Sequence, residues 1–144
     1  MLYFCTRACQ GHFFVYNRDM NREKLTEFLT RQTDRVWDRL CESYPNLVRY
    51  NPPIIKLSGR LWRTAGMCHQ ENNIVQLGYK FFLAKPEYYN EMVSVILPHE
   101  IIHQADYNLF GESEKKCGHG KNWCDIMVKY GLPPNKHHNM EISR

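Results

Sequence analysis

Residues 99–103, HEIIH, decide the fold: they read H-E-x-x-H and lie in an apolar stretch of helical pattern. Residues i and i+4 lie on one face of a helix, so both imidazoles can reach one metal ion. Zinc accepts neutral imidazole, and a metal lowers the pKa of a coordinated water towards roughly 7. Glu100 follows the first histidine directly and can accept a proton from that water. The stretch therefore predicts a metal-dependent hydrolase with His99 and His103 as ligands and Glu100 as general base.

A catalytic zinc takes three protein ligands, so a third residue must join the two histidines. His119 is the best candidate, because it lies beyond the helix and has a glycine on each side. Glycine permits the tight backbone that would direct an imidazole back at the helix. The sequence leaves three alternatives open, namely Glu112, Glu114 and Cys117.

The chain before the motif predicts one helix followed by a small sheet. Residues 1–16 are rich in aromatic side chains and indicate a short strand or a packed arm. Residues 21–44 carry apolar side chains near one face and predict a helix, with Asn21 as a weak N-cap and Asn17 or Asp19 as alternatives. A small antiparallel sheet is predicted from three short apolar runs, at residues 54–57, 61–68 and 73–77.

Two more helices are expected in the second half. The first runs from Pro86 to about residue 107, and Pro98 should kink or restart it. The second covers residues 121–130 and ends before a Gly-Leu-Pro-Pro sequence, after a loop at 111–120. The fold class predicted is therefore α+β, with the H-E-x-x-H helix and a C-terminal helix after the third histidine.

Length and composition limit the chain to one domain. It has 144 residues, 43% of them hydrophobic, which is enough for one packed core. We expect the domain to cover residues 1–134, with its core at about 20–134, and a polar tail at 135–144 in which His137 and His138 are solvated. No apolar run is long enough to span a membrane.

The N-terminus does not have the pattern of a secretory signal, which predicts an intracellular protein. The six cysteines are then expected to remain thiols. A protein substrate is expected, together with a monomeric state and no membrane partner.

The two motifs HEIIHQAD and GHGKNWCDIMVKYGLPP resemble those of the SprT-like zincins, the family that includes SprT and the Spartan protease domain. The resemblance covers about residues 20–134 and is strongest at the two motifs. It implies a zincin-like α+β fold, zinc bound by His99, His103 and His119, and Glu100 as the base. It also implies that Trp123 and Met127 are core residues under the zinc site.

The resemblance implies a metalloprotease that acts on proteins associated with DNA or crosslinked to it. Pro98 departs from an ordinary helix residue before the first ligand, and the C-x-x-C pairs of a zinc ribbon are not found. Contacts with single-stranded or damaged DNA would therefore come from the domain itself. The candidate contact residues are Arg60, Trp62, Arg63, Lys115, Lys116 and Lys121. The net charge of +4 permits such a polyanion without requiring it.

Two other functions remain open from the sequence. The chain could be a non-catalytic, zinc-stabilised module that binds DNA or protein, although a structural site has no need of Glu100. It could also be a zinc amidase acting on a small substrate, in which case an enclosed pocket is expected in place of an open groove. Four tyrosines are candidates for stabilising the oxyanion, and the sequence does not choose among them: Tyr79, Tyr88, Tyr89 and Tyr107.

Overall fold

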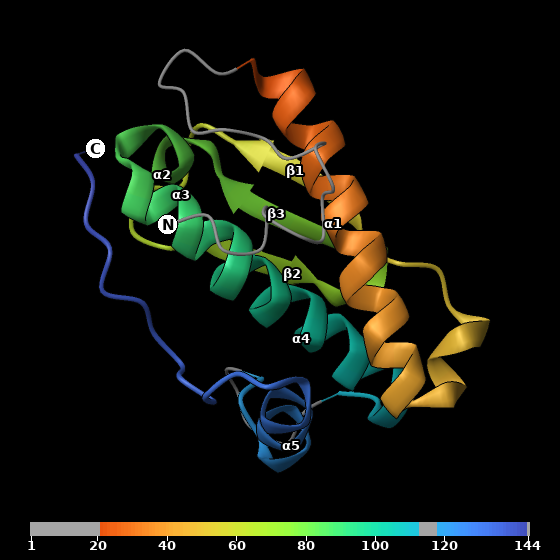
Figure 1. Cartoon of the computed structure of the whole chain (residues 1–144). Coiled ribbons are helices and arrows are strands. Elements are labelled where there is room, and N and C mark those ends of the chain that lie inside the picture. Colours follow the sequence, from red (N-terminus) through yellow and green to blue (C-terminus); the bar gives the residue numbers. More distant parts are fainter. Residues whose placement is uncertain (1–20, 113–117, 144) are drawn as a thin grey trace.

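The computed structural model describes residues 21–112 and 118–143 (Figure 1). The predicted N-terminal arm therefore lies outside the described residues. The elements in chain order are helix α1 (Arg22–Ser43), 3₁₀ turn η2 (Pro45–Arg49), strands β1 (Ile54–Ser58) and β2 (Gly66–His69), 3₁₀ turn η3 (Gln70–Asn72), strand β3 (Ile74–Gly78), helices α2 (Tyr79–Ala84) and α3 (Pro86–Glu91), π turn η4 (Met92–Ile96), and helices α4 (Leu97–Phe110) and α5 (Lys121–Tyr130). The predicted α+β class is confirmed.

Helix α1 forms where the apolar pattern placed it. The Asn21 side chain accepts hydrogen bonds from the backbone N–H groups of Glu23, at 2.7 Å, and Lys24, at 3.3 Å, so Asn21 is the N-cap. The buried face of the helix packs on β1 and on α4, and its residues are Leu25, Phe28, Leu29, Thr33, Val36, Trp37 and Leu40.

The sheet is mixed, whereas an antiparallel sheet was predicted. Its order is β1-β3-β2: β2 pairs antiparallel with β3 through the tight η3 turn, and β1 pairs parallel with β3. The chain leaving β1 crosses to the far edge of the sheet, where β2 runs in the opposite direction to β1. Strand β3 then turns back between them and runs in the same direction as β1. The second strand also begins at Gly66, later than the predicted residue 61. Helix α2, directly after β3, was not predicted.

Helix α4 is the central helix of the domain and is buried on nearly every side over Leu97–Asp106. The irregularity expected at Pro98 takes the form of the π turn η4, in which the Leu97 N–H donates to the Met92 carbonyl. In a regular helix the Pro98 ring would clash with the carbonyl of Ser94. The wider turn accommodates the proline and lets the helical chain continue to the histidines.

Helix α5 packs against α4, and beyond it the C-terminal segment, residues 132–143, returns along α4 towards α3 (Figure 1). Gly131 ends α5 in the left-handed region at φ 108°. Within the described ranges, no helix combines the length and apolarity that a membrane span requires. Cys41, Cys68 and Cys124 are free thiols, as expected, and the other three cysteines lie outside the described residues.

Candidate metal centre and active site

Three imidazoles meet at one point beside α4. The Nε2 atoms of His99 and His103 are 3.3 Å apart, and that of His119 lies 3.1 Å from His103 and 3.3 Å from His99. His99 and His103 face the same side of α4, while His119 reaches them from the loop before α5. The structure thus brings together the three histidines that the sequence singled out.

The spacing of these nitrogens suits a tetrahedral cation. Zinc–nitrogen bonds of about 2.0–2.1 Å at tetrahedral angles place the ligand nitrogens about 3.3 Å apart. Three mutual contacts cannot all be hydrogen bonds, because each Nε2 carries either one proton or one lone pair. A cation at the centre would satisfy all three lone pairs at once, so the residues fit a metal ion.

The surroundings keep the imidazoles neutral, which is the form that binds metal. Burial lowers the pKa of His99 to about 4 and that of His103 to about 3, with smaller contributions from neighbouring histidines. Burial, followed by the charges of Lys136 and His137, also lowers the pKa of His119. The lone pairs are therefore available over the physiological range.

Glu100 lies beside this cluster and is 7% exposed. Its Oε2 atom is 3.7 Å from His99 Nε2. Burial raises the pKa of Glu100 to about 8, because the carboxylate loses its hydration, and a nearby cation would favour the ionised form. A carboxylate in this position can accept a proton from a molecule held between it and the three histidines.

Two glycines leave room for the site. A Cβ atom on Gly66 in β2 would lie 2.9 Å from Glu100 Cγ, so only glycine fits opposite the base. Gly118 has φ +76°, and its Cβ would lie 3.3 Å from the His103 ring. A hydrogen bond to the Gly118 backbone also holds that ring. Gly66 was predicted to lie in a strand, whereas its contact with Glu100 was not predicted.

Trp123 in α5 forms the floor of the histidine cluster. It is fully buried and stacks on the His103 ring at 5.2 Å between centroids, with edge contacts to His99 and His119. Met127, one helical turn later, is 1% exposed. The expectation that both are core residues under the site is confirmed.

A polar network that the sequence analysis missed fixes α4 to the sheet. Gln104 is 1% exposed and donates to the Gln70 carbonyl at 3.1 Å, while its Oε1 accepts from the Cys68 thiol at 3.5 Å. Gln70 in turn donates to the His103 carbonyl at 3.4 Å. In the sequence, the network is marked only by Gln104 directly after His103, and a glutamine at that position has no distinctive pattern. The network holds β2 and the metal-site helix in one position relative to each other.

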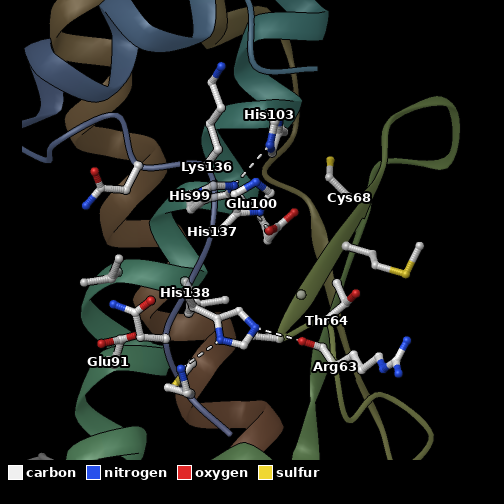
Figure 2. A pocket seen from close by; sticks show the side chains of 18 of the residues that line it. Arg63, Thr64, Cys68, Glu91, His99, Glu100, His103, Lys136, His137 and His138 are labelled. Carbon is white, nitrogen blue, oxygen red and sulfur yellow. Dashed lines mark hydrogen bonds and ion pairs between the residues drawn. The ribbon is translucent and has the colours of Figure 1, made fainter. Parts of the chain in front are cut away.

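A cleft of about 1230 Å³ opens onto the histidines (Figure 2). One side is β2 with the preceding loop, the floor is α4, and the other side is the C-terminal segment. The expectation of solvated histidines in a polar tail is wrong for His138, whose Nε2 donates to the Arg63 carbonyl at 2.9 Å. Met140 is 5% exposed, and the Glu141 N–H donates to the Tyr88 hydroxyl oxygen at 2.9 Å.

The structure places some of the residues predicted to contact DNA in the cleft and others on the exposed surface. Trp62 and Arg63 line the cleft, with the Arg63 guanidinium 4.8 Å from the Trp62 ring centroid. Arg60 is exposed, whereas Lys121 forms an exposed ion pair with Asp125 at 2.6 Å. Lys115 and Lys116 lie outside the described residues, as do two of the alternative metal ligands, Glu114 and Cys117. The remaining alternative ligand, Glu112, is exposed and is not part of the histidine cluster.

Comparison with known proteins places the chain in a family. The sequence model of the SprT-like family matches residues 25–142. Protein SprT of Pseudomonas putida (strain GB-1) is 32% identical over 81 residues, which are 56% of this chain and 46% of that protein. Protein SprT of Actinobacillus succinogenes is 29% identical over 79 residues (54% and 43%), and that of Pseudomonas syringae pv. syringae is 28% identical over 96 residues (66% and 55%).

The chain spans about half the length of the curated relatives it matches. No solved structure matches it. The histidine cluster agrees with a zinc-metalloprotease-like domain. Since the family match covers most of the sequence, the chain belongs to the SprT-like family.

Proposed function

We propose that this protein is a zinc-dependent peptidase that hydrolyses peptide bonds, and that its substrates include proteins associated with DNA or crosslinked to it. The observation that carries the proposal is the convergence of three Nε2 atoms within 3.3 Å of one another, with the Glu100 carboxylate beside them. In this proposal His99, His103 and His119 hold the zinc ion. Bound there, zinc supplies Lewis-acid polarisation of a carbonyl group and lowers the pKa of water.

Glu100 performs the proton transfers of the reaction. Its carboxylate accepts a proton from the attacking water and returns it to the leaving amine nitrogen. Burial strips the carboxylate of competing water, and the tight fit against Gly66 fixes its direction. A buried carboxyl with a raised pKa beside a ligand cluster is typical of an acid–base group.

The shape of the cleft supports a polypeptide substrate over a small amide. The volume of about 1230 Å³ exceeds the ~300–1,000 Å³ typical of small-molecule pockets. The space is lined along its length by β2 and by the C-terminal segment, and it is open to solvent. An extended peptide fits such a groove.

Support for a nucleic-acid partner is confined to one end of the cleft. Arg63 lies over the Trp62 ring there, and an arginine next to an aromatic ring can bind a single strand by charge and stacking. The ion pair of Lys121 with Asp125 makes that lysine a weaker candidate.

The test is a cleavage assay with the zinc-loaded chain on fluorescein-labelled casein, with and without a single-stranded oligonucleotide, beside Glu100→Gln. We expect cleavage by the unaltered chain and a fall of about 10²–10⁴-fold in the variant, with zinc retained. Stimulation by the oligonucleotide that is lost in Arg63→Ala supports the DNA part. Stoichiometric zinc without cleavage under either condition contradicts the peptidase and favours a binding module.

A further inference from the structure

The reaction proposed above needs a hydrogen-bond donor for the carbonyl oxygen that gains charge, and the tyrosines considered from the sequence do not supply it. The cleft is not lined by any of the four, all of which belong to the described part of the chain. Tyr88 instead accepts a hydrogen bond from the Glu141 backbone, and Tyr89 is completely buried. A side-chain donor that assists the metal would therefore come from another residue of the cleft.

Some cationic and amide side chains along the cleft already have partners. Gln70 donates to the His103 carbonyl, and the Arg63 guanidinium lies over Trp62. Both ring nitrogens of His138 are used, because Nδ1 accepts from the Met140 N–H at 3.1 Å and Nε2 donates to Arg63. The N–H groups of Arg63 and the amides of Asn135 and Asn139 also line the cleft, and the remaining described cations of the lining are Lys136 and His137.

The segment that carries these two residues is held at both ends. Before them, the Leu132 N–H donates to the Met127 carbonyl at 2.9 Å, at the end of α5. After them, His138 is fixed by its two hydrogen bonds and by an edge contact with Phe81 at 5.4 Å. A donor on this segment is therefore positioned before substrate arrives, which is the condition for strong stabilisation of a developing charge.

His137 lies near the histidine cluster without being part of it. It lines the same cleft as His99 and His119, and burial, with smaller contributions from nearby groups that include His137, lowers the pKa of both. Its ring nitrogens are nevertheless not among the ligand atoms that lie within 4.8 Å of one another. Glu100, by contrast, packs against Gly66 on the β2 side of the cluster. His137 thus comes to the cleft from the C-terminal segment, whereas the base comes from α4, and both are labelled in Figure 2.

We propose that His137 is a catalytic residue whose ring N–H donates a hydrogen bond to the oxygen of the scissile carbonyl as that oxygen gains charge. The proposal rests on the peptidase function proposed above. His138, the next residue, is a positioning residue, because its contacts with Arg63 and Phe81 hold the segment in place. No bond of the protein forms or breaks in this role.

The test compares His137→Ala, His137→Gln and Lys136→Met with the unaltered zinc-loaded chain on labelled casein, measuring kcat, KM and bound zinc for each. Loss of one such donor lowers kcat by about 10²–10³-fold. We expect that loss in His137→Ala, with KM changed less than about threefold and zinc unchanged. His137→Gln, which retains an N–H donor, should recover part of the rate. Ser143→Ala, an exposed position on the same segment that does not line the cleft, is the matched control and should behave as the unaltered chain.

Several results overturn the proposal. A kcat of His137→Ala within about threefold of the unaltered value removes the catalytic role, and loss of zinc in that variant makes His137 a ligand instead. A large loss in Lys136→Met with none in His137→Ala transfers the role to the lysine. If the unaltered chain holds zinc and cuts nothing, the proposed function itself fails, and the role of His137 fails with it.

Discussion

Helix α4 and the C-terminal segment both line the cleft, yet they are specified in different ways. Helix α4 has an apolar pattern of helical period, so its histidines share a face for reasons that lie within five residues of sequence. The C-terminal segment has no periodic pattern and is held by contacts with distant residues, as when His138 binds the Arg63 carbonyl. Local spacing thus sets His99 beside His103, and long-range packing completes the cleft.

The largest expected effect comes from replacing His119, the histidine that reaches α4 from a separate loop. His119→Ala should lower zinc affinity by more than about 100-fold, because changes to residues behind the ligands alone cost about 10–100-fold. Glu112→Ala is the matched control, since Glu112 was an alternative ligand and is exposed outside the cluster. Competition with a chromogenic zinc chelator measures both. Loss of zinc in the Glu112 variant and its retention in the His119 variant would contradict the assignment.

The next effect separates local backbone strain from contact with the site. Gly118→Ala should lower zinc affinity by about 10–100-fold, because its methyl group would press on the His103 ring. Gly111→Ala is the matched control: its φ of +80° is equally left-handed, but its Cβ would meet nothing within 4 Å. Both variants should lose about 1–2 kcal/mol of stability from the backbone conformation. Equal zinc affinities in the two would show that the His103 contact has no role.

A third change releases the C-terminal segment without touching α4. His138→Ala removes two hydrogen bonds and an aromatic contact, worth about 2 kcal/mol together. Amide exchange of residues 135–142 should accelerate by more than about tenfold, while that of α4 stays slow. Asn139→Ala should leave both rates unchanged. Acceleration in α4 to the same degree would mean that the two regions open as one unit.

The smallest effect concerns a buried carboxyl within α4. Burial raises the pKa of Asp106 to about 6 from its ordinary value near 4, so the folded state binds the proton more tightly than the unfolded chain. The contribution of Asp106 to the stability of the unaltered chain should therefore fall as pH rises from about 4 to 6 and stay level above. Asp106→Asn should raise Tm by a few °C at pH 7.5 and by nothing below pH 4. An equal rise at both pH values would remove ionisation as the cause.

The sequence predicted those parts of the fold whose causes are local. Helix α1 begins at its asparagine cap, and α5 covers the predicted residues 121–130. The meeting of His99 and His103 follows from helical spacing alone. The glycines on either side of His119 made it the best candidate for the third ligand, while Glu112, Glu114 and Cys117 stayed open.

The parts that were missed depend on which distant segments meet. The parallel pairing of β1 with β3 comes from a crossover that has no turn signature. The role of Gly66 appears only when β2 lies against Glu100, and no pattern around a lone glycine indicates its future neighbour. Residues 135–143 are polar on average, but Met140 and His138 find partners on the domain.

The central claim is that His99, His103 and His119 hold one zinc ion. The most direct measurement is anomalous diffraction at the zinc absorption edge from crystals of the purified chain. We predict one strong peak at about 2.0–2.1 Å from all three Nε2 atoms, with Glu100 outside bonding distance. A peak held by other residues, or fully ordered histidines without a peak in crystals grown with zinc, would contradict the claim.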